Sequence, residues 1–173
     1  MLTLLASGRL LAIGVDIVYA LLNAAPQFGR GGWSAPVREV EARAAVPALA
    51  ETGDPLWAEI QLHNVGAKAT ALTFIPGWTT RVVLMDSRGR RIRPRREYRW
   101  IEGPLDGVSV IQQRGRTLLP GETCADQVDI HRLYELDAPG QYWVVLGQRL
   151  GQRPGMDGGP TVWTPPRLFV LDK

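Results

Sequence analysis

The chain has very few residues suited to acid–base or metal chemistry near neutral pH. Its 173 residues include one cysteine and two histidines, which are Cys124, His63 and His131. A single cysteine excludes an intramolecular disulfide, and neither histidine belongs to a His-Glu-x-x-His pair or a similar metal-ligand spacing. A Gly-x-Ser-x-Gly elbow and a phosphate-binding glycine loop are also missing. The sequence therefore predicts no catalytic residue, no metal site and no cofactor, and we expect a protein that is not an enzyme.

Long apolar runs are scarce as well. The main one, residues 10–22, contains Asp16 and is shorter than the roughly 20 apolar residues that cross a bilayer. Arg9 before it and Ala24 and Ala25 after it give residues 1–26 the layout of a secretory signal. Asp16 counts against that hypothesis, because a carboxylate is costly to desolvate in an apolar stretch.

Three interpretations of residues 1–26 therefore remain open. They are an export signal or degenerate anchor, an amphipathic helix retained in the folded protein, or the product of a wrongly assigned start. The helix would carry one apolar stripe, made of Leu10, Ile13, Ile17 and Leu21. We predict a linker over 27–35 and one domain over 36–173. The expected location is periplasmic, secreted or envelope-associated, with a cytoplasmic location as the alternative. Membrane association is expected only through the N-terminal segment.

Glycine and proline are frequent, with 19 and 13 residues, which favours the many turns of an all-β fold. Apolar residues alternate with polar ones over 56–63, so this segment is predicted to be a half-buried strand. We expect a first edge strand over 37–46, with a helix as the alternative, and a central strand over 82–85. Further short strands are expected at 72–74, 108–111, 117–119, 123–130, 142–146, 162 and 168–171. The spacing predicts an immunoglobulin-like antiparallel β-sandwich of about seven to nine strands, with an N-terminal apolar helical segment.

Several turn and strand motifs carry a resemblance. They are Leu62 to Gly66, Leu119-Pro120-Gly121-Glu122, Asp129-Ile130, Leu133 to Leu136 and Pro139 to Val144. With them the chain resembles bacterial immunoglobulin-like domains of secreted or envelope proteins. The pattern is also similar to small intracellular proteinase inhibitors and to the non-catalytic N-terminal part of deuterolysin-like metalloproteases. The resemblance covers about 57–171 and implies an architecture, and no catalytic residue can be carried over from it.

Positive charge is concentrated in one segment. Of the 20 cationic residues only Lys68 and Lys173 are lysine, and seven arginines fall between positions 88 and 99. Three interpretations compete: the charges protect a strand edge, contact an anionic macromolecule, or bind nucleic acid. The last is least favoured, because few aromatic residues lie nearby and acidic residues dilute the charge. The residues expected to contact a partner are Arg88, Arg91, Arg93, Arg95, Arg96, Arg99 and Trp100.

Other polar and aromatic residues are assigned mainly structural roles. The acidic cluster lacks the regular spacing of a calcium loop and is expected to be solvated; its members are Glu122, Asp126, Asp129, Glu135 and Asp137. Cys124 is expected to be a buried thiol. Trp143 is expected in the core, while Trp33, Trp78 and Trp163 either pack on loops or form a partner-facing patch. Tyr142 is either a core aromatic or a residue that anchors a corner through its hydroxyl group.

These features favour a non-enzymatic structural or protein-interaction domain. Its partner is expected to be an unidentified protein or an anionic envelope polymer. The first alternative is a protease inhibitor or accessory domain that presents a loop, either 103–107 or 147–159. The second is anion or nucleic-acid binding through residues 88–99.

Overall fold

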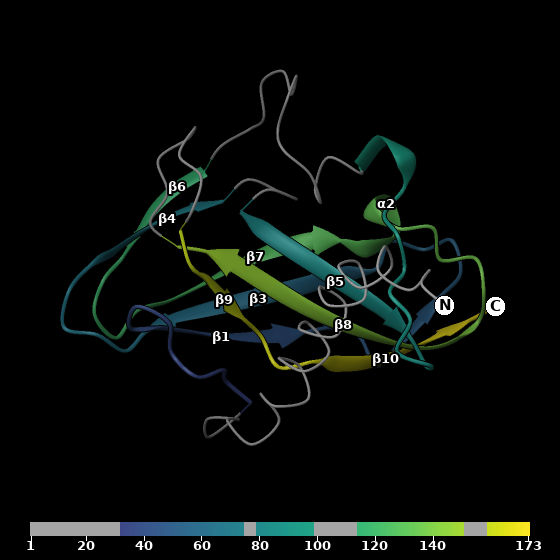
Figure 1. The fold of residues 1–173 in the computed structure, drawn as a ribbon, viewed down its shortest axis with the longest axis horizontal. Coiled ribbons are helices and arrows are strands. Elements are labelled where there is room, and N and C mark those ends of the chain that lie inside the picture. The colour runs from purple at the N-terminus through teal and green to yellow at the C-terminus, as the bar shows by residue number, and fades with distance from the viewer. Residues whose placement is uncertain (1–31, 75–78, 99–113, 151–158) are drawn as a thin grey trace, which may run out of the picture.

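The computed structural model describes residues 32–74, 79–98, 114–150 and 159–173. Within these ranges the chain forms ten strands and one short helix (Figure 1). The strands are β1 (Val40–Ala45), β2 (Leu49–Glu51), β3 (Trp57–Asn64), β4 (Thr70–Phe74), β5 (Thr80–Asp86), β6 (Arg114–Leu118), β7 (Thr123–Asp129), β8 (Gly140–Arg149), β9 (Thr161–Trp163) and β10 (Arg167–Asp172), and the helix is α2 (Ile130–Leu133). The all-β class is confirmed. No helix in the described part of the chain has the length and apolar character needed to cross a bilayer.

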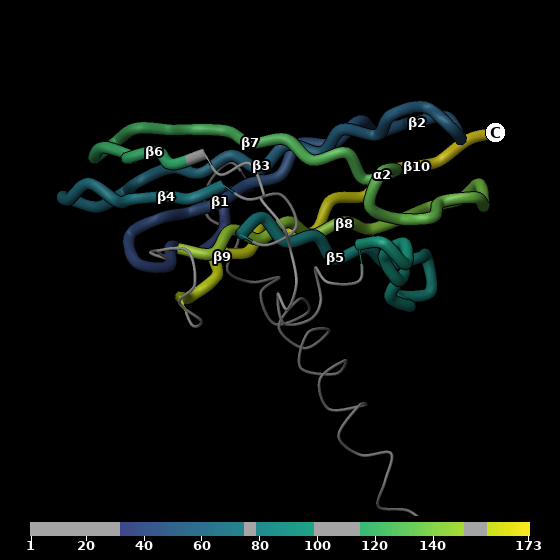
Figure 2. The backbone as a smooth tube through the Cα atoms, turned by 90° about the horizontal axis from the view of Figure 1, so that it is seen from above, coloured from purple at the N-terminus to yellow at the C-terminus, as the bar shows by residue number. Residues whose placement is uncertain are grey.

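The strands lie in two layers (Figure 2). One contains a three-stranded sheet in the order β1-β3-β7, and the other a five-stranded sheet in the order β2-β10-β8-β5, with β9 also paired to β8. Strands β4 and β6 form a separate two-stranded ribbon. All strand pairs are antiparallel except β2 and β10. The chain thus changes layer early, since β1 belongs to one sheet and β2 to the other.

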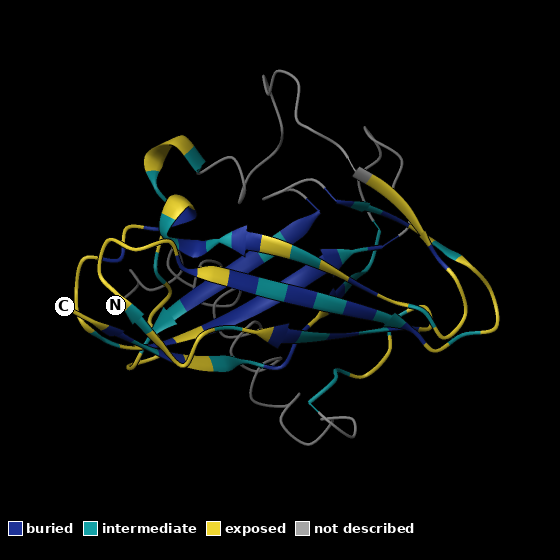
Figure 3. Cartoon of the chain, turned by 180° about the vertical axis from the view of Figure 1, so that it is seen from behind, coloured by how far each residue is buried: buried dark blue, intermediate teal, exposed yellow. Residues whose placement is uncertain are grey.

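Strand β3 shows how the sequence produces the core. Ala58, Ile60 and Leu62 are fully buried, and the residues between them are partly exposed, because successive side chains of a strand point to opposite faces. The register places Leu62 between Ala42 on β1 and Cys124 on β7. Figure 3 shows the same alternation of buried and more exposed residues along these strands. The predicted period of two and the buried thiol are confirmed here.

Strand β8 is covered on both faces, as predicted. Tyr142, Val144 and Leu146 lie in the core, and the Tyr142 ring stacks on Phe169 with their centroids 5.6 Å apart. Val145 points the other way and is also buried. The expectation for Trp143 was wrong. This side chain lies on the same outer face as Val145 but is 38% exposed, because the cover over that face at Val145 does not extend to this end of the strand.

The predicted central position of residues 82–85 was also wrong. Among the strands of the described residues, β5 stands at the end of its sheet and pairs with β8. Residues 82–85 are apolar on both faces of the strand because other parts of the protein cover both faces. A strand with only one neighbouring strand can be buried in this way, so an apolar run does not show that a strand is central. The other edge of β5 is occupied by the chain after residue 86, where Ile92 N–H donates to the Leu84 carbonyl (2.8 Å) and Met85 bridges to Arg91.

Asn64, the last residue of β3, ties two turns together although it is fully buried. Its Nδ2 donates to the carbonyl oxygens of Lys68 (2.7 Å) and Leu118 (3.0 Å), and its Oδ1 accepts from Gly66 N–H (2.9 Å). The backbone carbonyl oxygen of Asn64 accepts a hydrogen bond from Gly121 N–H (2.8 Å). The amide therefore fixes both the turn after β3 and the turn between β6 and β7.

Strand β1 (Val40–Ala45) confirms a strand within the predicted range 37–46 and excludes a helix there. The strand is preceded by a turn whose residues are not typical of turns. Val37 and Val40 exchange backbone hydrogen bonds of 2.8 and 3.0 Å, and the residues between them, Arg38 and Glu39, have φ values of 46° and 63°. Two positive φ values in a two-residue hairpin define a type I′ turn, which favours Asn and Gly.

We therefore expect Arg38→Asn to stabilise the protein by about 1 kcal/mol, because asparagine tolerates the left-handed conformation better than arginine does. Arg38 is exposed, so no packing is lost. Arg38→Ala is the matched control, since it removes the same side chain and gains no such preference. Thermal unfolding of both variants checks the prediction, and equal midpoints for the two would contradict it.

Candidate interaction surfaces

The arginine-rich segment turns tightly at its start and returns along β5. The Asp86 carboxylate accepts from the N–H groups of Arg88 and Arg90, both at 2.9 Å, and from Arg90 Nε at 2.7 Å. These hydrogen bonds, led by the Arg90 backbone, hold the pKa of Asp86 below its usual value. Because the carboxylate accepts from both backbone and side chain, it closes the turn.

The rest of the segment is anchored through its backbone. Arg95 N–H donates to the Leu133 carbonyl (2.8 Å), and Arg95 Nε donates to the His131 carbonyl (3.2 Å). Tyr98 packs against the core and accepts from Arg132 Nε (3.0 Å). Residues 87–98 therefore form a fixed ledge from the edge of β5 to α2, which we call the arginine ledge.

The predicted contact residues divide into three groups. Arg95 is used in anchoring the ledge and is partly buried. Arg99 and Trp100 lie outside the described residues. The remaining four point outward and are exposed: Arg88, Arg91, Arg93 and Arg96. The ledge covers an edge of β5, and at the same time it presents several guanidinium groups to solvent.

Two further arginines extend this positive region, and no pattern in the sequence pointed to them. Arg81 on β5 pairs with Gly147 on β8, and Arg149 lies two residues further along β8, on the same face. Burial lowers the pKa of Arg81, and the charges of Arg149 and then Arg91 lower it further. Arg149 and Arg91 are therefore each close enough to Arg81 to repel it. Only the strand register reveals this, because position 81 is distant in sequence from 149.

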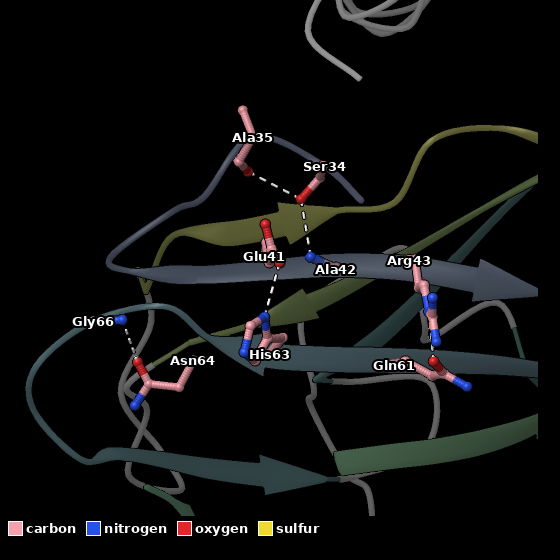
Figure 4. A network of polar contacts seen from close by, with 9 residues as sticks. All are labelled: Ser34, Ala35, Glu41, Ala42, Arg43, Gln61, His63, Asn64 and Gly66. Carbon is pink, nitrogen blue, oxygen red and sulfur yellow. Dashed lines mark hydrogen bonds and ion pairs between the residues drawn. The ribbon is translucent and has the colours of Figure 1, made fainter. Parts of the chain in front are cut away.

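The outer face of the three-stranded sheet carries a polar network (Figure 4). His63 Nδ1 lies 2.9 Å from Glu41 Oε1, and Arg43 Nε donates to Gln61 Oε1 at 2.6 Å. Trp33 packs on this face, with the Arg43 guanidinium 4.5 Å from its ring centre and the His63 ring 5.6 Å away. The loop-packing interpretation therefore fits Trp33.

Trp33 also has a neighbour that belongs to the predicted linker. Ser34 N–H donates to the Ala42 carbonyl (2.8 Å), and Ser34 Oγ accepts from Ala42 N–H (3.0 Å). The end of the 27–35 segment thus lies against β1. Of the other two tryptophans in the proposed patch, Trp163 is 39% exposed on the outer face of the five-stranded sheet, and Trp78 lies outside the described residues.

The acidic residues after β6 do not converge. Glu122 accepts from Leu119 N–H (2.9 Å) and Arg116 (2.7 Å), and these contacts, the backbone one first, lower the pKa of its carboxyl group. Asp126 points between the sheets, 3.1 Å from the Thr80 hydroxyl, and Asp129 caps α2 by accepting from Arg132 N–H (3.3 Å). Within the described ranges no group of three or more His, Cys, Asp or Glu could hold a metal ion.

The two histidines and the cysteine have separate surroundings. His63 lies in the polar network, and His131 on α2 contacts the Asp54 carbonyl. Burial raises the pKa of the Cys124 thiol, which disfavours a nucleophilic thiolate. These groups are thus spread over different parts of the sandwich.

No protein-family model matches the chain, and no curated protein does. Among solved structures, the C-terminal domain of wzt is similar at 10% identity and a TM-score of 0.47, over 84% of this chain and 76% of that one. The yjhA protein from Bacillus subtilis is similar at 17% identity and a TM-score of 0.39, over 82% and 97%. A β-glucosidase from Listeria innocua gives 15% identity and a TM-score of 0.41, over 78% of this chain. The chain spans only 16% of that enzyme.

Proposed function

We propose that this protein is a non-enzymatic immunoglobulin-like module that binds an acidic surface of a partner protein through the arginine ledge. Two features of the fold support the immunoglobulin-like part. The first segments change sheets, so that β2 runs parallel to the C-terminal strand β10. The Tyr142 hydroxyl at the start of β8 donates to the Ala138 carbonyl (2.6 Å), in the manner of the tyrosine corner of these sandwiches.

The observation that carries the proposal is the arrangement of the four exposed arginines on an anchored backbone. Because Arg95 and Ile92 fix the ledge by backbone hydrogen bonds, a partner that binds there does not have to order the chain. Clustered positive charge also attracts an acidic surface from a distance and raises the association rate.

Edge protection alone requires less charge than the ledge contains. One or two charged residues are enough to discourage pairing with a second strand edge, whereas this segment has seven arginines within twelve positions. Like charges at such density repel and oppose folding. We therefore assign the surplus charge to a partner, and treat the covering of β5 as the way in which the ledge is held.

The proposal can be tested with poly-glutamate as the probe and with two charge-matched variants of the full chain. The first variant changes Arg88, Arg93 and Arg96 to serine. The control changes Arg38, Lys68 and Lys173 to serine, which removes three positive charges from exposed positions elsewhere. Binding is measured by fluorescence anisotropy. We expect the ledge variant to weaken binding about 10-fold or more, and the control to weaken it about 2-fold at most.

Equal losses in the two variants would show attraction to net charge alone and would contradict the proposal. Tighter binding of duplex DNA than of poly-glutamate, lost in the ledge variant, would instead support the nucleic-acid alternative. The inhibitor alternative rests on loops that lie outside the described residues, except for the residues of 147–159 at its two ends. The exported or envelope-associated location stays a prediction of the sequence.

A further inference from the structure

One end of the five-stranded sheet carries large apolar side chains that are open to solvent. Register places Met85 on β5, Trp143 on β8 and Leu168 on β10 in one row across the sheet. The rings of Tyr142 and Phe169, one residue out of phase with this row, lie in the core, so the row belongs to the outer face. Figure 1 shows this sheet in front of the other layer, with its outer face toward the viewer. Even so, Trp143 and Leu168 are 38% and 41% exposed.

The same surface continues onto the short strand β2. Val170 on β10 is two residues beyond Leu168, so its side chain lies on the same face, and its register partner on β2 is Leu49. Leu49 is 60% exposed. We call these five neighbouring residues the end patch: Leu49, Met85, Trp143, Leu168 and Val170. Apolar residues that are exposed singly are ordinary, whereas a contiguous group of them marks a surface suited to a partner.

The arginine ledge forms one border of the end patch. Arg91 and Met85 make an isolated antiparallel bridge, so the Arg91 side chain continues the row on the same face. Arg88, in the turn that leads into the ledge, is exposed as well. The Asp86 carboxylate at this turn is paired with Arg90 (2.7 Å), so these two charges offset each other. The β5 border of the patch is therefore positive.

The opposite border, formed by β2 and the end of β10, is acidic. Glu51 on β2 pairs with Asp172 on β10, and both residues are exposed. They follow Leu49 and Val170 by two residues, so their side chains lie on the outer face too. Lys173 comes next in the chain, and its N–H donates to Asp172 Oδ1 (2.8 Å). Even when the positive charge of Lys173 is counted, this border keeps a negative net charge.

An apolar patch with opposite charges on its two sides is complementary to itself. A two-fold axis that lies in the plane of the interface turns a second copy so that its β2 border faces the β5 border of the first. The two apolar patches then meet at the centre, and each ledge lies against the acidic border of the other copy. Each contact occurs twice, as an isologous interface requires.

We infer that the acidic surface bound by the arginine ledge belongs to a second copy of this chain, and that two copies associate through their end patches. The inference rests on the proposed function, because it names the partner of the same ledge. The end patch occupies only part of one sheet face, so the dimer is expected to be weak, with a Kd of about 10–100 µM. Trp143, in the middle of the row, should contribute most to the affinity.

The oligomeric state of the full chain tests this inference. Sedimentation equilibrium is measured from about 5 to 500 µM protein, a range that brackets the expected Kd. We expect a monomer–dimer equilibrium that Trp143→Ser weakens about 10-fold or more. Trp57→Ser is the matched control, because Trp57 is 51% exposed but lies on β3, in the other sheet. It should change the Kd about 2-fold at most.

A pair of charge-reversed variants tests how the two copies face each other. One carries Arg88→Glu and Arg91→Glu, and the other carries Glu51→Arg and Asp172→Arg; all four positions are exposed. Each variant alone sets like charges against each other and should associate about 10-fold more weakly or worse than the natural chain. In an equimolar mixture both contacts again join opposite charges, so heterodimers should form with about the natural affinity.

Three outcomes would contradict the inference: a chain that stays monomeric up to about 500 µM, equal effects of Trp143→Ser and Trp57→Ser, or a mixture that associates no better than its separate components. The proposed function is judged separately by the binding of poly-glutamate. A monomeric chain whose ledge still binds poly-glutamate would refute this inference alone. A chain that neither associates nor binds poly-glutamate would refute the proposed function as well.

Discussion

Replacing Asn64 by leucine is expected to destabilise the protein by about 4 kcal/mol, the largest effect of any single substitution that we predict. The side chain is fully buried and makes three hydrogen bonds, to the Lys68 and Leu118 carbonyl groups and from Gly66 N–H. Leucine has nearly the same size but no polar atom. Each backbone group that loses its partner in a buried place costs about 1–3 kcal/mol, and the added apolar packing offsets part of the sum.

The loss should spread beyond the site, because Asn64 joins two turns. Without the amide, the turn after β3 and the turn between β6 and β7 each lose an anchor, and β4 and β6 meet in register just beyond them. We therefore expect faster amide hydrogen exchange in β4 and β6 than in β8. Chemical unfolding gives the free energy, and exchange gives its distribution.

Gln127→Leu is the matched control for Asn64. Gln127 also carries a side-chain amide and lies on the same sheet, but it is exposed, and its contact with Glu59 is 3.3 Å long. Its replacement should cost less than about 0.5 kcal/mol. A loss below about 1 kcal/mol for Asn64→Leu would show that water replaces the amide and that the turns do not depend on it.

The second large effect is expected at Gly147. A Cβ atom there would lie 2.5 Å from Cε3 of Trp163 and 2.7 Å from Cζ3, which is far inside van der Waals contact. The indole ring lies directly against the β8 backbone, and only glycine leaves room for it. Gly147→Ala should therefore cost about 2–3 kcal/mol and push the ring away from the sheet.

A double variant separates the steric clash with Trp163 from any general effect of replacing glycine by alanine in a strand. In the background of Trp163→Leu the obstructing ring is gone, so Gly147→Ala should cost much less than it does in the natural chain. Gly115→Ala on β6 is the control, because a Cβ there has no atom within 4 Å, and it should be neutral or slightly stabilising. The unfolding midpoints of the natural chain, the two single variants, the double variant and the Gly115→Ala control test this prediction. An equal cost of Gly147→Ala with and without Trp163 would contradict the steric account.

The sequence predicted those parts of the fold that depend on local alternation. Strands β3 and β8 have clear periods of two, and the structure has the predicted residues in the core. The turn at Pro120 and Gly121 and the alternatives for Tyr142 were also visible, because both depend on neighbours in the chain. Tyr142 in fact combines its two alternatives, since its ring lies in the core and its hydroxyl group anchors the corner.

What could not be predicted depends on contacts between distant segments. An apolar segment such as β5 is compatible with a central or a terminal place in a sheet, because burial of both faces does not reveal the number of strand neighbours. The positive φ values at Arg38 and Glu39 are imposed by the pairing of β1 with the residues before it. The closeness of Arg81, Arg149 and Arg91 likewise follows from register, which composition does not contain.

The candidate site was predicted in part. Composition identified the segment rich in arginine, and the structure shows that four of its predicted contact residues are exposed while Arg95 anchors the backbone. Which arginines are exposed and which one anchors the backbone depends on the path of the chain from β5 to α2. Backbone hydrogen bonds to the carbonyl groups of Leu84 and Leu133 set this path. Charge alone could not have revealed it.

The central claim is that the arginine ledge binds an acidic surface by charge, and the salt dependence of binding tests it most directly. The affinity of the full chain for poly-glutamate is measured from about 50 to 500 mM sodium chloride, over which the screening length falls from roughly 14 to 4 Å. The account predicts that affinity falls at least 10-fold across this range, and that the ledge variant shows a shallower dependence than the variant lacking Arg38, Lys68 and Lys173. An affinity that does not change with salt, or equal slopes for the two variants, would contradict it.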